Sequence, residues 1–300
     1  MGPTGVGKSD FALQLAAQVQ GEIINCDVGQ FYAPLSIGTA KPDWQSSPIA
    51  HHLFDILSEP KNFSVTEFRK RVEQLIAEIR SRNHLPIIVG GSGFYVNALF
   101  FPPREDVAEA TSLITLEGDQ TWEKLNAIDP VRAQQIDPND QYRIQRALQI
   151  WEQTGILPSL LKPVYRPVSD KFILVHVERE REELYARINA RTQSMLEEGW
   201  IEEVQRIPNW YPFLQKKRLI GYAEIIDYLV APEQDKQALI ATIQQATRHY
   251  AKRQMSFWRM LARALQTAQS NGFIMQANLT LSPVDLYIRQ LQEKIFNSPS

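Results

Sequence analysis

The amino-terminal end of the chain contains a phosphate-binding loop motif. Gly2-Pro3-Thr4-Gly5-Val6-Gly7-Lys8-Ser9 matches G-x-x-x-x-G-K-[ST] at every fixed position. Glycines in such a loop let backbone N–H groups converge on an anion, and the helix that follows directs its positive end to the same point. Lys8 can reach the outer phosphate, and the Ser9 hydroxyl can hold Mg²⁺. The motif predicts a ligand with at least two linked phosphates, such as ATP or another nucleotide, without specifying which compound or whether a phosphoryl group is transferred.

A buried apolar strand normally precedes a phosphate loop of this kind. Here only Met1 precedes the motif. We therefore expect the native chain to carry an upstream segment of about 5–6 apolar residues, a typical strand length. Without that strand, the sheet is expected to have a gap or an open edge beside the site.

Strand-like and helical segments alternate after the loop. Apolar residues recur at helical spacing over Lys8–Val19, Glu22–Asp27 is a short apolar run, and Leu85–Val89 is a second one. Between these runs, Ser64 and Glu67 form a capping box at the start of a helix. This alternation predicts an α/β fold of the P-loop NTPase-like type, with a parallel sheet flanked by helices.

The middle of the chain has a different pattern. From Pro102-Pro103 to about Pro167 the sequence is helical without a convincing strand, and Phe172–Val177 is strand-like again. We therefore predict a catalytic core formed by residues 1–102 and 169–300, with residues 103–168 as a helical insertion domain. After Arg181 the chain is predicted to be mainly helical, including a long helix that reaches about Gln269.

Composition sets limits on compartment and partners. The net charge of −2 argues against a uniformly basic nucleic-acid binder but leaves room for a local basic surface. The sequence has neither a charged-then-apolar leader nor a long apolar run, so we expect a cytoplasmic protein without a membrane partner. Cys26 is the only cysteine, which excludes an internal disulfide and fits a reducing compartment. We interpret Cys26 as a small buried residue and not as a nucleophile.

Two polar side chains follow predicted strands at the edge where open α/β sheets bind ligands. Asp27 ends the first apolar run and could accept a proton from a group that attacks the phosphorylated ligand. A helix cap or a turn residue is the alternative interpretation of Asp27. Ser92, in Gly90-Gly91-Ser92-Gly93, could donate a hydrogen bond in the same cleft, or the loop could be a simple strand-to-helix turn.

Basic residues share one face of the long predicted helix. Their spacing confines them to a sector of about 60°, and Phe257 and Trp258 lie nearby, as expected for a surface that binds a phosphate backbone with unstacked bases. An ordinary solvated helix face is the alternative. The residues are Arg248, Lys252, Arg259 and Arg263, with a second cluster at Lys216-Lys217-Arg218. His51-His52 is interpreted as a hydrogen-bonding structural pair, because neighbouring residues on a strand point to opposite faces and lack metal-ligand spacing.

In combination, these motifs resemble the tRNA dimethylallyltransferase family, also called isopentenyl-tRNA transferases. The matching segments span nearly the whole chain: Gly2–Ser9, Asp27–Tyr32, Ile37–Pro42, His51–Asp55, Val89–Tyr95, Pro138–Asp140 with Arg143 and Arg146–Leu148, Arg218–Tyr222, Ala251–Gln254 and Trp258–Arg259. The resemblance implies transfer of a dimethylallyl group from dimethylallyl diphosphate to N6 of the adenosine 3′ of the tRNA anticodon, with release of diphosphate. It also implies a monomer.

The resemblance also assigns roles. Asp27 matches the family's catalytic aspartate, Ser92 stands where the family usually has threonine, and Arg218 matches an arginine that helps hold the diphosphate. Residues Gly2–Ser9 would bind the donor diphosphate, with Mg²⁺ on Ser9. The residues expected to contact tRNA are Asp27, Val28, Gly29, Gln30, Arg143, Arg146, Lys252, Arg253 and Arg259.

Two departures from the family pattern are visible. Val28 replaces a common serine, and the insertion is short between Pro103 and Trp122. Three other functions remain open on the sequence. The nearest is a dimethylallyltransferase acting on free adenine nucleotides. The second is a small-molecule P-loop kinase in which Asp27 activates a hydroxyl. The third is a non-catalytic RNA-binding module.

Overall fold

The computed structural model describes residues 1–103, 121–161, 164–233 and 235–296. The chain divides into two compact units. The first comprises Met1–Phe63, Lys70–Val96 and Ser169–Ser300, and the second comprises Ser64–Arg69 and Asn97–Val168. The second unit therefore interrupts the first one along the chain.

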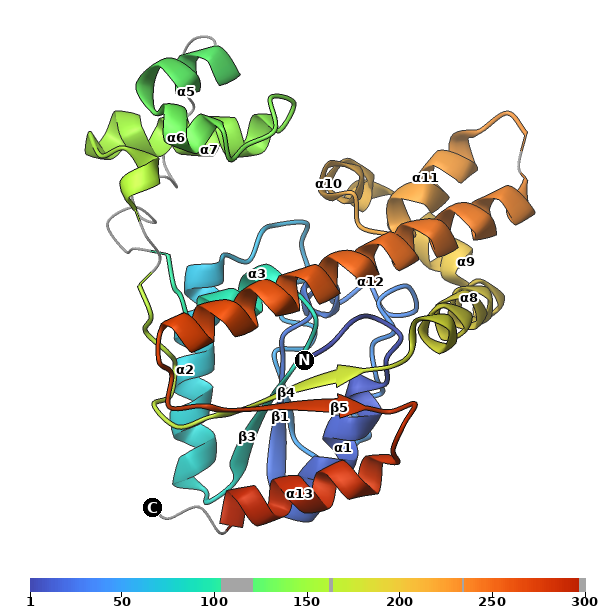
Figure 1. Cartoon of the computed structure of the whole chain (residues 1–300). Coiled ribbons are helices and arrows are strands. Elements are labelled where there is room, and N and C mark those ends of the chain that lie inside the picture. The colour runs from blue at the N-terminus through green and yellow to red at the C-terminus, as the bar shows by residue number, and fades with distance from the viewer. Residues whose placement is uncertain (104–120, 162–163, 234, 297–300) are drawn as a thin grey trace. The chain divides into compact units, whose positions relative to one another are not determined.

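The strands of the first unit form two parallel sheets (Figure 1). In one sheet, β1 (Gly21–Asn25) lies between β2 (His51–His52) and β3 (Leu85–Val89). In the other, β4 (Ile173–Glu178) pairs with β5 (Phe273–Asn278) in parallel, Ile173 opposite Phe273. Every ladder in the described part of the chain is parallel, which confirms the predicted α/β class. The sequence analysis missed β5, because it interpreted the chain after Arg181 as mainly helical.

The two sheets meet beside the phosphate loop. The amino group of Met1 donates a hydrogen bond to the carbonyl of Val175 (2.6 Å), and the N–H of Val177 donates to the carbonyl of Met1 (2.7 Å). Met1 thus continues the β4–β5 sheet by one residue on the edge of β4. The expected gap in the sheet is present among the described strands, since β3 and β4 belong to separate sheets. The upstream strand itself stays a prediction.

Helices cover both faces of the β4–β5 sheet. Figure 1 shows α12 (Lys236–Thr267) on one side of this sheet and α13 (Val284–Phe296) on the other. The packing is apolar: Val177, Met275 and Ala277 of the strands share one buried cluster with Ala251 of α12 and Ile288 of α13. Burial of this surface is the main favourable contribution to the stability of the layers. The same cluster takes in Phe11 and Leu15 of α1 (Lys8–Val19) and Leu184 and Ile188 of α8 (Arg181–Glu197).

The other helices described for the first unit are short, apart from α2, which begins in the second unit. Sequence signals define two of their ends: Ser64 and Glu67 exchange the reciprocal bonds of the predicted capping box, and Gly221 at φ 84° precedes α11. The elements are η1 (Val28–Phe31), α2 (Val65–Ser81), α3 (Gly93–Ala98), α9 (Trp200–Gln205), η3 (Pro208–Trp210), α10 (Tyr211–Lys217) and α11 (Tyr222–Val230). No helix in the described ranges has the length and hydropathy needed to cross a bilayer.

The second unit is helical over its described residues. It contains α5 (Trp122–Ile128), α6 (Pro130–Ala133), α7 (Gln141–Thr154) and η2 (Pro158–Leu160) around a core that includes Leu125, Ile144 and Leu148. Asp129 links two of these elements, since its carboxylate accepts from the N–H groups of Arg132 (3.0 Å) and Ser159 (2.8 Å). Most of the stretch between Pro103 and Trp122, where the sequence departs from the family pattern, lies outside the described residues.

Candidate active site

The phosphate loop has the backbone conformation that its glycines allow. Gly5 and Gly7 adopt φ values of 80° and 99°, which side chains other than glycine rarely tolerate. Lys8 begins α1, and its ammonium group donates a hydrogen bond to the carbonyl of Pro3 (2.8 Å). Burial lowers the pKa of Lys8 to about 8. The loop is therefore preformed, with a cation inside it that an anionic ligand would stabilise.

Three arginines of the β4–α8 region contact this loop. Arg179 donates to the carbonyl of Val6 (3.0 Å), Arg187 to the carbonyl of Gly5 (3.0 Å) and Arg191 to the hydroxyl of Thr4 (2.5 Å). Arg191 was missed by the sequence analysis. Its spacing of four residues from Arg187 places both on one face of a helix, but only the fold brings that face to the phosphate loop.

Asp27 lies two residues after the end of β1 and caps η1. Its carboxylate accepts from the N–H of Gly29 (3.2 Å), and its own N–H donates to the side chain of Asn25 (2.8 Å). Burial raises the pKa of Asp27 above its ordinary value, and the charges of Lys8 and Arg191 oppose that shift. The capping interpretation is thus correct, and the same side chain is also a desolvated carboxylate beside two cations. Such a group can accept a proton.

The Gly90–Gly93 loop brings Ser92 next to Asp27. The hydroxyl of Ser92 accepts from the N–H of Val28 (3.0 Å), and Gly93 begins α3, so the loop is also a strand-to-helix turn. Tyr250 of α12 also belongs to this group: its pKa is raised mainly by burial and then by the charge of Asp27, while a bond with Ser92 opposes the shift. Sequence periodicity gave no reason to select Tyr250.

Gln254 of α12 ties the two loops together. Its side-chain oxygen accepts from the N–H of Thr4 (2.8 Å), and its side-chain amide donates to the carbonyl of Gly91 (2.8 Å). Gln254 is 7% exposed. Because a buried amide with both ends bonded holds its partners in fixed positions, α12 sets the distance between the phosphate loop and the Ser92 loop.

Two cavities adjoin at Asp27. The smaller, of about 70 Å³, is lined by Lys8, Ser9, Asn25 and Gln30 among others. The larger, of about 350 Å³, is lined by polar and apolar side chains that include Ser92, Met195, Trp200, Arg218 and Tyr250. Both cavities share the residues Thr4, Asp27, Thr39 and Arg191.

Most of the site residues predicted in the catalytic core therefore lie around these two cavities. Asp27, Ser92, Arg218, Thr4, Lys8, Ser9, Val28, Gly29, Gln30 and Arg253 line one cavity or both. Lys252 and Arg259 are exposed on α12 and line neither cavity. Arg248 donates to the side chain of Asn189 (2.7 Å). On the predicted basic face, the residues exposed to solvent are therefore mainly Lys252, Arg259 and Arg263. Arg143 and Arg146 belong to α7 of the second unit.

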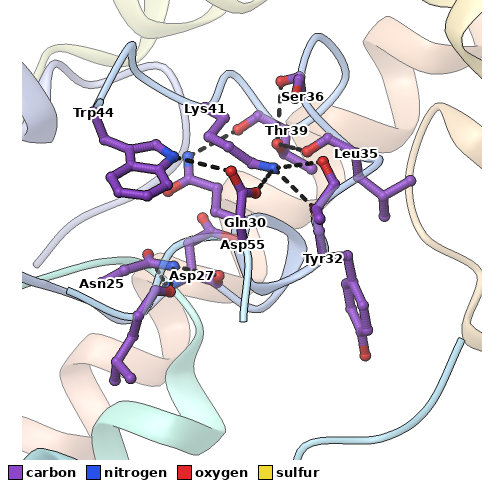
Figure 2. A network of polar contacts seen from close by, with 12 residues as sticks. Asn25, Asp27, Gln30, Tyr32, Leu35, Ser36, Thr39, Lys41, Trp44 and Asp55 are labelled. Atoms are coloured by element: carbon purple, nitrogen blue, oxygen red, sulfur yellow. Dashed lines mark hydrogen bonds and ion pairs between the residues drawn. The ribbon is translucent and has the colours of Figure 1, made fainter. Parts of the chain in front are cut away.

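A polar network holds the segment that closes the smaller cavity (Figure 2). The ammonium group of Lys41 is bonded to the carboxylate of Asp55 and to the carbonyl of Tyr32 (2.9 Å), and the indole N–H of Trp44 donates to the same carboxylate (3.0 Å). The side-chain amide of Gln30 donates to the carbonyl of Thr39 (3.0 Å). These bonds hold Thr39 in the lining of the cavity.

The histidine pair has the hydrogen-bonding role that the sequence predicted. His51 contacts the carbonyl of Ile49 through Nδ1 (2.7 Å), and Nε2 of His52 contacts Glu22 (2.7 Å). Glu22 also accepts from Arg82 (2.8 Å), and this bond is the main reason that its pKa falls to about 2. Cys26 is buried and unpaired, and burial raises the pKa of its thiol.

Comparisons with known proteins agree on one family. A family model described as IPP transferase matches residues 30–261. The tRNA dimethylallyltransferase of Halothermothrix orenii is 38% identical over 86% of this chain and 83% of its own length, and that of Anoxybacillus flavithermus is 40% identical over 86% of each.

Solved structures give the same result. A tRNA isopentenylpyrophosphate transferase from Bacillus halodurans is 32% identical, with a TM-score of 0.67 over 99% of this chain and 94% of that one. A eukaryotic dimethylallyltransferase acting on tRNA is 27% identical, with a TM-score of 0.81 over 99% of this chain and 79% of that one.

Proposed function

Because the chain belongs to the IPP transferase family of tRNA dimethylallyltransferases, we propose that it moves a dimethylallyl group from dimethylallyl diphosphate to N6 of the adenosine 3′ of the tRNA anticodon. One observation supports the proposed reaction most directly. The desolvated carboxylate of Asp27 lies where the phosphate-loop cavity joins a larger, partly apolar cavity. A base placed there serves a reaction whose leaving group is anionic and whose acceptor is an amine.

The donor diphosphate would occupy the junction of the two cavities. Lys8 and Ser9 face it from the smaller cavity, Arg218 from the larger one, and Thr4 and Arg191 from both. As the allylic C–O bond breaks, its electron pair leaves with the diphosphate and negative charge grows there. Fixed donors aimed at developing charge lower the barrier, typically by about 3–4 kcal/mol for each donor.

Asp27 would remove the proton that the acceptor must lose. N6 forms its new bond to the allylic carbon, and the amino proton passes to the Asp27 carboxylate. Since burial raises the proton affinity of Asp27, the carboxylate is a stronger base than an exposed aspartate. The bond from Gly29 N–H holds one carboxylate oxygen, which leaves the other free to face the amine. The target base must leave its stack to reach this position.

Mg²⁺ fits the oxygen donors of the smaller cavity. Ser9, in the first turn of α1, lines it with a hydroxyl oxygen, and Mg²⁺ takes oxygen ligands of this kind together with phosphate oxygens and water. We propose that Ser9 holds the ion with the donor diphosphate, whose charge the ion would neutralise.

The tRNA would contact basic residues of α12 and of the helical insertion. Lys252 and Arg259 are exposed on α12, and Arg253 lines the larger cavity from the same helix. Arg143 and Arg146 of α7 would contribute from the helical insertion. We propose that one chain suffices, because both cavities are lined by residues of a single compact unit.

The direct test incubates the chain with unmodified tRNA and labelled dimethylallyl diphosphate, then digests the RNA and identifies the nucleoside. N6-dimethylallyladenosine at the position 3′ of the anticodon is the expected product. Parallel reactions replace the tRNA by AMP, or the donor by γ-labelled ATP. Label in AMP or on a phosphorylated product would replace the proposal by the nucleotide or kinase alternative. Retention of tRNA without diphosphate release would leave an RNA-binding module.

A further inference from the structure

Glu203 of α9 is a buried carboxylate bonded to a loop, residues 36–40, that borders both cavities. It is 9% exposed. One of its oxygens accepts from the N–H groups of Ser36 (2.9 Å) and Ile37 (2.7 Å), and the other accepts from the N–H of Gly38 (3.3 Å) and the hydroxyl of Tyr222 (2.6 Å). A carboxylate that receives three successive backbone N–H groups holds that backbone by charge-assisted bonds, which are stronger than neutral ones.

Trp200, one turn before Glu203, fills the space beneath the same loop. A Cβ atom at Gly38 would lie 2.0 Å from the indole nitrogen, and one at Gly221 would lie 1.9 Å from the ring. The indole is therefore packed against two glycine backbones, one in the loop and one in the turn before α11. Both contacts need glycine, because any side chain would overlap the ring.

The segment held in this way lines the reaction site. Gly38 and Thr39 border the larger cavity, while Thr39 and Ala40 border the smaller one. Thr39 also packs on η1: a Cβ atom at Gly29 would lie 2.8 Å from its methyl group. Gly29 in turn donates to Asp27. Figure 2 shows Thr39, Ser36 and Leu35 together in this loop, with dashed lines for the bonds that the Thr39 hydroxyl makes to the carbonyls of Leu35 and Ser36.

We propose that Glu203 is a positioning residue for the acceptor side of the reaction, an inference that rests on the proposed transferase function. Through its bonds to Ser36, Ile37 and Gly38 it fixes the loop that borders Asp27, and the hydroxyl of Tyr222 holds its second oxygen in place. Among the described residues, none of its hydrogen bonds reaches the phosphate loop. Loss of Glu203 should therefore disturb the acceptor and its orientation more than donor binding.

The test compares Glu203→Ala, Glu203→Gln and the matched control Glu202→Ala. Glu202 is an exposed carboxylate on the same helix. We expect Glu203→Ala to lower kcat/KM for tRNA by about 10- to 100-fold, the scale of a displacement near 1 Å, with the KM for dimethylallyl diphosphate within about threefold of wild type. Glu203→Gln should recover part of the loss, because its carbonyl oxygen can still accept from Ser36 and Ile37. Glu202→Ala should match wild type.

Amide hydrogen exchange gives a readout that needs no turnover. The N–H groups of Ser36 and Ile37 should be protected in wild type and in Glu202→Ala, and should exchange faster in Glu203→Ala. If Glu203→Ala does not fold, Glu203→Gln carries both the kinetic and the exchange tests, because it is nearly isosteric and removes only the charge that Ser36, Ile37 and Gly38 share. Equal losses for donor and tRNA, or unchanged protection in Glu203→Ala, would overturn the inference. An inactive wild type would count against the transferase function alone, since the exchange measurement still tests the loop contact.

Discussion

Replacing Asp27 by asparagine separates proton transfer from donor binding. Asparagine has nearly the same shape and its side-chain oxygen can still accept from Gly29 N–H, so the cap of η1 is retained. The variant cannot accept the proton from N6. We therefore expect transfer to fall by about 10²- to 10⁴-fold, the range for a lost general base, which corresponds to about 3–5 kcal/mol of the barrier.

The same substitution should change diphosphate binding in the opposite direction. Burial lowers the pKa of both Lys8 and Arg191, and the negative charge of Asp27 opposes that shift because it attracts their positive charges. That charge also repels a bound diphosphate, so its removal should strengthen pyrophosphate binding by about 1 kcal/mol, or about fivefold. A variant that binds its anion more tightly while losing turnover is hard to explain by general damage to the site.

The assays are single-turnover transfer at saturating donor and calorimetric titration with pyrophosphate. In wild type, the transfer rate should rise with pH through an apparent pKa above the ordinary aspartate value of 3.8, because burial raises the pKa of Asp27. This dependence should be absent from Asp27→Asn. Transfer within tenfold of wild type would refute the role of Asp27 as the base. Pyrophosphate binding that weakens in proportion to activity would indicate a collapsed site.

Three further outcomes are expected. Lys8 has a pKa of about 8 and is cationic only below it, so the affinity of the free chain for dimethylallyl diphosphate should fall as pH rises through 8, measured by donor titration across that range. Exchanging Lys252 or Arg259 for glutamine should weaken tRNA binding and reduce the slope of log K against log salt by about one each. Since Glu22 has a folded pKa of about 2, below its ordinary 4.5, its hydrogen bonds, first with Arg82 and then with His52 and His84, stabilise the fold above pH 4.5. That contribution, about 3 kcal/mol, should disappear as pH falls from 4.5 to 2, measured by urea unfolding.

Matched variants make these outcomes decisive. Lys8→Met should remove the fall in donor affinity above pH 8, and a fall that persists would assign it to another group. Lys236→Gln, at the start of the same long helix, should leave the salt slope unchanged, and an equal effect there would indicate diffuse charge attraction. Glu22→Gln should flatten the acid limb of the stability curve; a limb of unchanged depth would contradict the role of Glu22.

Local interactions explain what the sequence could predict. Helix α1 spans the predicted Lys8–Val19 and β3 the predicted Leu85–Val89, because apolar spacing and the glycine and proline residues that interrupt it act over a few residues. Strand β1 ends at Asn25, two residues before the predicted end, because Asp27 leaves the strand to cap η1. Strand β5 was missed because it alternates exposed Phe273 and Gln276 with only Met275 and Ala277 buried, which is a weak apolar signal after a long helix.

The site residues that were not predicted from the sequence are defined by long-range contacts, which no local sequence pattern encodes. Arg191 and Gln254 bond to Thr4 from positions 187 and 250 residues later in the chain. Glu203 bonds to Ser36 across 167 residues. A sequence motif identifies the loop that holds a phosphate. The side chains that hydrogen-bond to this loop belong to helices that are distant in the sequence and adjacent only in the fold. Those partners become visible only when the tertiary packing is known.

The residues that line both cavities have a thermodynamic consequence for binding. Thr4, Asp27, Thr39 and Arg191 contribute to both, so a molecule held in either compartment alters the surface met by a molecule entering the other. The two affinities must then be linked, and linkage is reciprocal: whatever factor prenyl donor imposes on RNA, RNA imposes on prenyl donor. Coupling between the two proposed substrates would therefore need no domain rearrangement, because the same four residues line both cavities.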